Sequence, residues 1–146
     1  MSRQELVKGL NHAMNREVST FLRYMLQAAS IRGAVWESVR LMYLSEVTDE
    51  VGHAQYLANK IAMLGGIPRL EPDLTPPPAD PREMLEHDRV EEQVDVEHYL
   101  KLAEMAEREK LVDLKMKMEE QAADEAEHAE HMSRLLGDRR GVPVAG

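Results

Sequence analysis

The stretch Asp49-Glu50-Val51-Gly52-His53 decides how the rest of this chain is interpreted. Residues three apart share one face of a helix, so Glu50 and His53 can grip a single metal ion. The same pattern returns at Asp124-Glu125-Ala126-Glu127-His128. Chance alone gives about one Glu-x-x-His match in a chain of this composition. The residues around the two pairs must therefore decide whether they form a site.

Composition favours one all-helical domain. The chain has 146 residues, of which 31% are charged and 4% are aromatic, a balance typical of long helices. Its net charge of −9 favours cations as partners and argues against nucleic acid. It has no cysteine, which excludes disulfides, thiolate sites and iron–sulfur clusters. No leader-like segment and no membrane-length apolar run is present, so we expect a cytoplasmic protein without a membrane partner.

Two long helices are predicted before residue 65. The first begins at about Arg3, in the capping box Ser2-Arg3-Gln4-Glu5, and Gly33 ends it. The second runs from about Trp36 to Leu64 and stops at Gly65-Gly66. Spacings of three and four define the inward faces. They comprise Leu6, Leu10, Ala13, Glu17, Phe21, Tyr24, Ala28 and Ile31 on the first helix, and Val39, Tyr43, Glu46, Glu50, His53, Leu57 and Leu64 on the second.

The segment 66–80 is the only long irregular stretch predicted, and it is rich in proline. Its residues in polyproline-like extension reach about 45 Å at ~3.1 Å each. The second helix is about 44 Å long at ~1.5 Å per residue. The segment can therefore run back along the whole bundle as a long crossover. The alternative is a flexible linker between two helical hairpins.

Two more helices are predicted after the crossover. Asp80-Pro81-Arg82-Glu83 is a helix start, and a phase break predicts a tight turn near 107–110. The fourth helix ends at Gly137. The inward faces comprise Leu85, Asp88, Glu92, Asp95, Tyr99, Leu102 and Ala106, then Leu111, Leu114, Met118, Gln121, Glu125, His128, Met132 and Leu135. We therefore assign residues 1–137 to one four-helix domain and 138–146 to a short C-terminal tail.

Charged and imidazole groups interrupt all four inward faces. The candidate metal ligands are Glu17, Glu50, His53, Glu92, Glu125 and His128. Unpaired, such charges cost several kcal/mol each to bury. Two divalent ions balance four carboxylates, and oxygen and nitrogen ligands suit iron or manganese. The alternative is a rotated face of salt bridges. The hydroxyl of Tyr24 can hydrogen-bond a neighbouring carboxylate.

One Glu from each of two helices, with Glu-x-x-His from each of the other two, is the di-iron or di-manganese pattern of ferritin-like bundles. The predicted fold class is therefore all-α: a ferritin-like four-helix bundle with one long crossover between the second and third helices.

The chain resembles the bacterioferritins from about residue 5 to 136. The motifs in family order are Leu10-Asn11, Glu17, Tyr24, Asp49-Glu50-x-x-His53, Leu64-Gly65-Gly66-Ile67-Pro68, Glu83-Met84-Leu85, Asp88, Glu92 and Asp124-Glu125-x-x-His128. The resemblance implies that Glu17 and Glu92 are terminal ligands, Glu50 and Glu125 bridge, and His53 and His128 are terminal.

The resemblance also implies a function. It implies two iron ions per subunit, with manganese as an alternative, and a ferroxidase that oxidises Fe(II) with oxygen or hydrogen peroxide. The ferric product would be stored in a homo-oligomeric shell, which also detoxifies iron.

Two departures from the family change these expectations. Bacterioferritins bind haem through a methionine just after the bridging Glu of the second helix, and Val51 stands there. We therefore expect no haem. The fifth short helix of the large cages is missing, which favours a dimer or a smaller shell.

Rival functions come from other classes. A rubrerythrin-like peroxidase, or another di-iron or di-manganese oxidase, would store no iron. Asp95 favours it, because rubrerythrins carry an extra carboxylate there, while the missing cysteine module argues against that architecture. A Dps-like DNA-shielding shell ranks low, because its ligands lie between subunits and this chain lacks a basic tail. The roles of Glu46, Asp95 and His131 stay open; His131 is a surface residue or a ligand for metal access or for a second site.

Overall fold

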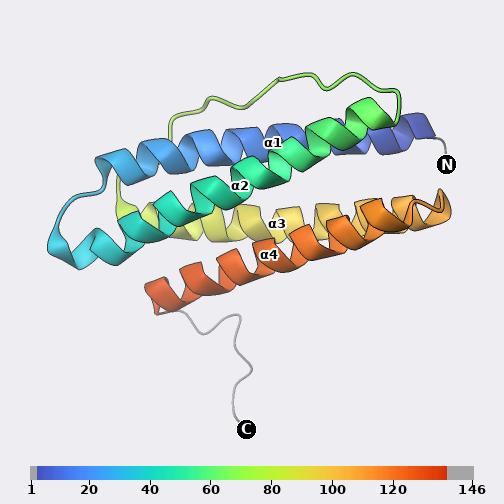
Figure 1. Ribbon diagram of the computed structural model, residues 1–146. Helices are drawn as coiled ribbons and strands as arrows, with labels where there is room; N and C mark the ends of the chain where they lie inside the picture. The colour runs from blue at the N-terminus through green and yellow to red at the C-terminus, as the bar shows by residue number, and fades with distance from the viewer. Residues whose placement is uncertain (1–2, 138–146) are drawn as a thin grey trace, which may run out of the picture.

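The computed structural model describes residues 3–137, which form four long α-helices and no strand. The helices are α1 (Arg3–Ser30), α2 (Glu37–Met63), α3 (Pro81–Arg108) and α4 (Val112–Leu136), with a short 3₁₀ helix η1 (Ala34–Trp36) before α2. Neighbours in sequence form two antiparallel hairpins, α1 with α2 and α3 with α4 (Figure 1). The predicted all-α four-helix bundle is confirmed. Ser2 of the capping box and the tail 138–146 lie outside the described residues.

The local signals at the helix ends act largely as expected. The Asp80 side chain accepts a hydrogen bond from the Glu83 amide and caps α3. Gly137 ends α4 in the left-handed conformation, with φ at 71°. The turn between α3 and α4 contains no glycine, and Lys110 adopts the left-handed conformation with φ at 60°. The prediction for Gly33 is wrong, because α1 already ends at Ser30 and Gly33 precedes η1.

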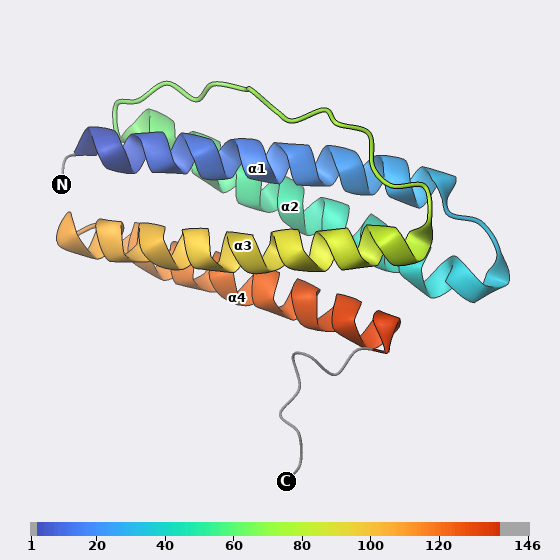
Figure 2. The same ribbon diagram turned by 180° about the vertical axis from the view of Figure 1, so that it is seen from behind.

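The crossover between α2 and α3 runs the length of α1 (Figures 1 and 2). Three polar side chains at four-residue spacing on α1 hold it in place. Asn11 and Asn15 each donate to a crossover carbonyl and accept from a crossover amide. The hydroxyl of Ser19 accepts from the Asp73 amide. The long crossover is therefore confirmed, and it is hydrogen-bonded to α1. The alternative of a flexible linker is wrong.

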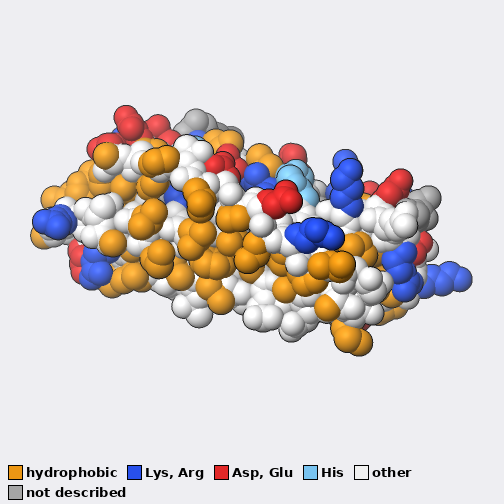
Figure 3. Space-filling model, turned by 90° about the horizontal axis from the view of Figure 1, so that it is seen from above, with side chains coloured by type: hydrophobic (Ala, Val, Ile, Leu, Met, Phe, Trp, Pro, Cys, Tyr) orange, Lys and Arg blue, Asp and Glu red, His pale blue; other side chains and the backbone are white. Residues whose placement is uncertain are grey.

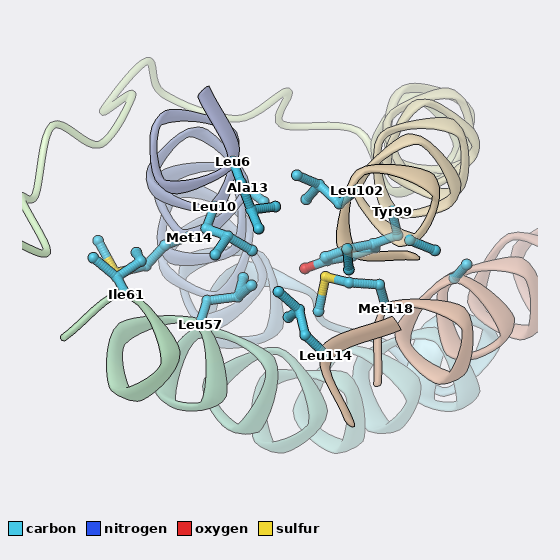
Figure 4. Close-up of a cluster of buried hydrophobic side chains, with 13 residues drawn as sticks. Leu6, Leu10, Ala13, Met14, Leu57, Ile61, Tyr99, Leu102, Leu114 and Met118 are labelled. Carbon is cyan, nitrogen blue, oxygen red and sulfur yellow. The ribbon is translucent and has the colours of Figure 1, made fainter. Parts of the chain in front are cut away.

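The apolar core is divided into two clusters. One contains Leu6, Leu10, Ala13, Met14, Leu57, Ile61, Tyr99, Leu102, Ala103, Ala106, Leu114, Met118 and Ala122 (Figure 4). The other contains Tyr24, Ala28, Ile31, Val39, Met42, Tyr43, Met84, Leu85 and Met132. Phe21, expected on the inward face, is only partly buried, and Thr20 is buried instead. On each helix, the polar site residues lie in the sequence between the residues of one apolar cluster and those of the other. The bundle therefore has a charged layer between two apolar ends.

No helix within residues 3–137 combines the length and apolar character needed to cross a membrane.

Candidate metal centre

The six predicted ligands come together in the middle of the bundle. All six are buried, and they form two groups whose ligand atoms lie within 4.8 Å of one another. The groups are Glu17, Glu50, His53 and Glu125, and Glu50, Glu92, Glu125 and His128. Glu50 and Glu125 belong to both. The structure thus brings these side chains into the arrangement of two adjacent cation sites that share two carboxylates.

Each histidine faces three carboxylates through one ring nitrogen. Nδ1 of His53 lies 3.6 Å from Glu17, 3.5 Å from Glu50 and 3.2 Å from Glu125. On the other side, Nδ1 of His128 lies 3.4 Å from Glu50, 3.6 Å from Glu92 and 3.5 Å from Glu125. The two halves are related by an approximate internal symmetry that exchanges α1 with α3 and α2 with α4.

The second ring nitrogen of each histidine is held by an aspartate from the opposite helix. His53 Nε2 lies 2.9 Å from Asp124 Oδ2, and His128 Nε2 lies 3.0 Å from Asp49 Oδ2. A hydrogen bond from Nε2–H to a carboxylate fixes the tautomer that leaves Nδ1 free as a ligand. Both rings are therefore oriented with Nδ1 toward the carboxylates.

Two buried tyrosines hold the terminal carboxylates. The Tyr24 hydroxyl donates to Glu92 Oε1 at 2.5 Å, and the Tyr99 hydroxyl donates to Glu17 Oε1 at 2.7 Å. Tyr24 thus makes the type of contact expected from the sequence. Tyr99 lies on the predicted inward face of the third helix, and it stands seven residues after Glu92, as Tyr24 stands seven residues after Glu17.

The atoms that point inward have no hydrogen-bond partner. These are Oε2 of Glu17 and Glu92, both carboxylate oxygens of Glu50 and Glu125, and Nδ1 of His53 and His128. Buried polar atoms are normally paired, so a whole set of unpaired acceptors needs a physical reason. Hard oxygen and imidazole donors around one point suit divalent iron or manganese. The residues present therefore fit two metal ions.

Crowding of the carboxylates shifts their proton affinity. Burial, together with the charges of Glu17 and Glu92, raises the pKa of Glu50 well above its ordinary value. The pKa of Glu125 is raised by burial and by the same two charges. Burial disfavours the imidazolium of His128, but Glu92 and Glu46 overcome it and raise its pKa to about 10. Protons thus offset part of the negative charge of the carboxylates, and bound cations would have to displace them.

Two further buried aspartates on α3 are held outside the metal groups. Asp95 Oδ1 accepts from Arg16 Nε at 2.5 Å, and Asp95 belongs to neither group of converging ligands in residues 3–137. Asp88 accepts from Arg23, Gln27 and Tyr43. The carboxylate that favoured a rubrerythrin-like site is thus engaged by an arginine.

Comparisons with known proteins show the family of the chain and its fold. A sequence model described as the ferritin-like domain matches residues 7–142. A ferritin-like, diiron-carboxylate protein of Bacillus anthracis str. Ames has 38% identity, with a TM-score of 0.88 over 93% of this chain and 99% of that chain. No curated protein matches the sequence.

Two bacterioferritins share the fold at lower identity. That of Mycobacterium tuberculosis has 20% identity and a TM-score of 0.84, over 94% of this chain and 87% of that chain. That of Rhodobacter capsulatus, described with a metal-free dinuclear site and heme iron, has 20% identity and a TM-score of 0.81, over 93% and 86%.

Proposed function

Because the chain belongs to the ferritin-like domain family, we propose that it is a bacterioferritin-like ferroxidase that oxidises Fe(II) at the dinuclear centre described above. The observation that carries this proposal is that the inward and outward atoms of the centre differ in their hydrogen bonding. Inward-facing oxygen and nitrogen atoms lack partners, while the outward atoms of the histidines and terminal glutamates are hydrogen-bonded.

Each side chain has a defined task in this proposal. Glu50 and Glu125 are shared by both cation positions, so they bridge. Glu17 and His53 would be the terminal ligands of one cation, and Glu92 and His128 those of the other. Tyr24 and Tyr99 fix the terminal carboxylates and exclude water, since both are fully buried. Manganese is the alternative metal, because the same donors suit it.

The chemistry needs two electrons from the metal pair. Two adjacent Fe(II) ions supply one electron each, so two protons and hydrogen peroxide yield two waters, or oxygen and two protons yield peroxide. The buried acids with raised pKa, Glu50 and Glu125, hold protons that metal binding releases.

We also propose that the protein acts as a homo-oligomer that stores the ferric product. Apolar side chains cover much of the face formed by α1 and α2 (Figure 3). Exposed apolar side chains on the two helices include Met25, Leu26, Leu41, Leu44 and Val51. A contiguous apolar area on one face favours association, and a second copy of this chain is the partner that we propose. The cytoplasmic location stays a prediction.

The test is aerobic loading with Fe(II) followed by measurement of assembly mass and iron content. We expect rapid oxidation of two Fe(II) per chain, then uptake of many more irons per particle. Uptake that stops at about two per chain would indicate a non-storing oxidase or peroxidase. A protein in which Glu17→Ala leaves fast oxidation unchanged would contradict the site.

A further inference from the structure

A pocket lies between the first half of α1 and the crossover, where the two run side by side (Figures 1 and 2). It has a volume of about 330 Å³ and is lined by Lys8, Asn11, His12, Asn15, Arg69 and Glu71. We call it the crossover pocket. Its volume lies at the lower end of the range of small-molecule sites. The crossover pocket shares no residue with the two groups of converging metal ligands.

Arg69 is held against α1 through its backbone. Its amide donates to Asn11 Oδ1 at 2.9 Å, and its carbonyl accepts from Asn15 Nδ2 at 2.8 Å. Because both backbone polar groups of Arg69 are engaged, the point at which its side chain leaves the crossover is fixed. The hydrogen bonds thus place a guanidinium group in the wall of the pocket, together with Lys8 and His12.

The two strongly basic side chains of the pocket have no acidic partner. In residues 3–137, neither Lys8 nor Arg69 forms an ion pair, although Glu71 lines the same pocket. The chain has 27 Asp and Glu against 18 Lys and Arg, so carboxylates are plentiful. Two unpaired cations that share one pocket in such a chain favour an anion as the ligand.

The side chain of Asn11 supplies a neutral donor. An asparagine amide has two N–H bonds. One of those of Asn11 donates to the Ile67 carbonyl at 3.1 Å, and the other has no acceptor within residues 3–137. Asn15, by contrast, uses both of its N–H bonds on backbone carbonyls. A guanidinium, an ammonium and an amide N–H around one pocket match the acceptor oxygens of a phosphate group.

Positive charge continues along α3 beside the pocket. His98 packs edge-on against His12, with 5.3 Å between the ring centres. Burial and the charge of Arg16 lower the pKa of His98, and Lys101 acts in the same direction. An anion bound next to His12 is therefore attracted by more groups than those that line the pocket.

We propose that the crossover pocket binds a phosphate group, with Arg69 and Lys8 as the charged donors and Asn11 as the neutral donor. His12 adds a hydrogen bond through a ring N–H. The ligand is inorganic phosphate or the phosphate of a small metabolite, since both present the same oxygens. Glu71 opposes binding by its charge. The proposal does not depend on the metal chemistry proposed for the dinuclear centre.

Binding is tested on the metal-free protein, so that iron cannot take up the phosphate. Calorimetric titration with inorganic phosphate should show one saturable site per chain. Arg69→Gln or Lys8→Gln should weaken binding about tenfold, which is the effect of losing one charge-assisted hydrogen bond. Arg82→Gln is the matched control, because it removes an exposed charge on α3 outside the pocket. Its affinity should change less than about twofold.

A substitution of Glu71 should have the opposite effect. Glu71→Gln should tighten binding about threefold, because it removes a negative charge from the pocket wall. The side chain of Glu71 is exposed, and its contact with α1 is made by the backbone amide, which the substitution keeps. A gain in affinity separates ligand binding from a purely structural role of the pocket.

Folding does not confound these variants. Lys8 and Arg69 are exposed, and the hydrogen bonds between Arg69 and α1 are made by the backbone. Phosphate should also raise the Tm of the parent and of Arg82→Gln more than that of Arg69→Gln, because the bound ion would join α1 to the crossover.

Glycerol phosphate, titrated in the same way, distinguishes the two sources of the ligand. Tighter binding than that of the free ion would support the phosphate of a metabolite, and weaker binding would support inorganic phosphate. Absence of saturable binding of both would overturn the proposal. Equal affinities for Arg69→Gln and Arg82→Gln would also overturn it. Because no metal is present, these results do not depend on whether the protein oxidises Fe(II).

Discussion

Asp124 on α4 hydrogen-bonds His53 on α2, with 2.9 Å between Oδ2 and Nε2. Asp49 makes the reciprocal contact with His128 at 3.0 Å. The aspartate of each Asp-Glu-x-x-His sequence therefore orients the histidine of the other one. The two motifs depend on each other, so a substitution of the aspartate on one helix should change the orientation of the histidine on the other.

Asp124→Ala should lower metal affinity by about 10- to 100-fold, because His53 loses the partner that fixes its tautomer. Calorimetric titration of the metal-free protein with Mn(II) measures this. Glu120→Ala, at an exposed position of the same helix, is the matched control. Equal affinities for Asp124→Ala and the parent would show that His53 needs no orienting group.

Divalent metal should stabilise the protein through Glu50 and Glu125. At a metal concentration about 100 times Kd, the gain is about 3 kcal/mol, which corresponds to about 5–10 °C in Tm. The double variant Glu50→Gln, Glu125→Gln should lose this gain and be at least as stable without metal, since two buried acids are removed. Thermal unfolding with and without Fe(II) under anaerobic conditions, with Mn(II) as the redox-silent control, measures both. A double variant that keeps the metal-dependent shift would make these residues structural.

The metal-free protein should lose stability as pH rises from about 5 to about 8.5. Burial raises the pKa of Glu46 from 4.5 to about 8. Between these values the folded state binds protons that the unfolded chain has released, so stability falls as pH rises. Tm measured against pH in the presence of a chelator should decline, and Glu46→Gln should flatten the decline. A Tm that rises across this window would contradict the assignment.

Association should depend on the apolar face of α1 and α2. Leu41→Glu together with Leu44→Glu places charges at two positions that are 53% and 45% exposed. We expect the assembly to fall to a smaller species, while the circular dichroism of the helices is unchanged. Light scattering after size-exclusion chromatography gives the mass. The same substitutions at Val112 and Met116, exposed on α4, serve as the control and should leave the mass unchanged.

The protein should purify without a Soret band, even when haem is supplied. Val51 stands where the family places its axial methionine, and its aliphatic side chain offers no ligand atom. An absorption spectrum of the purified protein tests this. Stoichiometric haem would show that another residue had become the axial ligand.

The helices and the inward-facing ligands could be predicted from the sequence, because both follow from periodicity. The pattern that repeats Glu50 and His53 at Glu125 and His128 fixed which faces meet. Phe21 shows the limit of that reasoning. It satisfies the spacing, but α1 presents Thr20 and Gln27 to the interior, and Gln27 is required there as a donor to Asp88.

The residues that support the site were harder to find from spacing alone. The side chains of Asp49 and Asp124 are about half exposed, so no inward-facing pattern includes them. Only their repetition before each Glu could have signalled a role. The partners of Asn11 and Asn15 are backbone groups of the crossover, which carry no side-chain signal. Lys110 adopts a left-handed conformation that glycine usually marks, so only the phase break revealed that turn.

The division of the ligands between the two hairpins has a mechanical consequence. The α1–α2 hairpin carries Glu17, Glu50 and His53, and the α3–α4 hairpin carries Glu92, Glu125 and His128. Bound metal would thus cross-link two halves that the polypeptide joins only through the crossover. Cutting that segment would turn one site into a contact between two fragments, whose effective concentration is no longer set by a tether. The ions would then add to the apolar clusters that also join the two hairpins, and removal of metal should weaken the association of the two fragments.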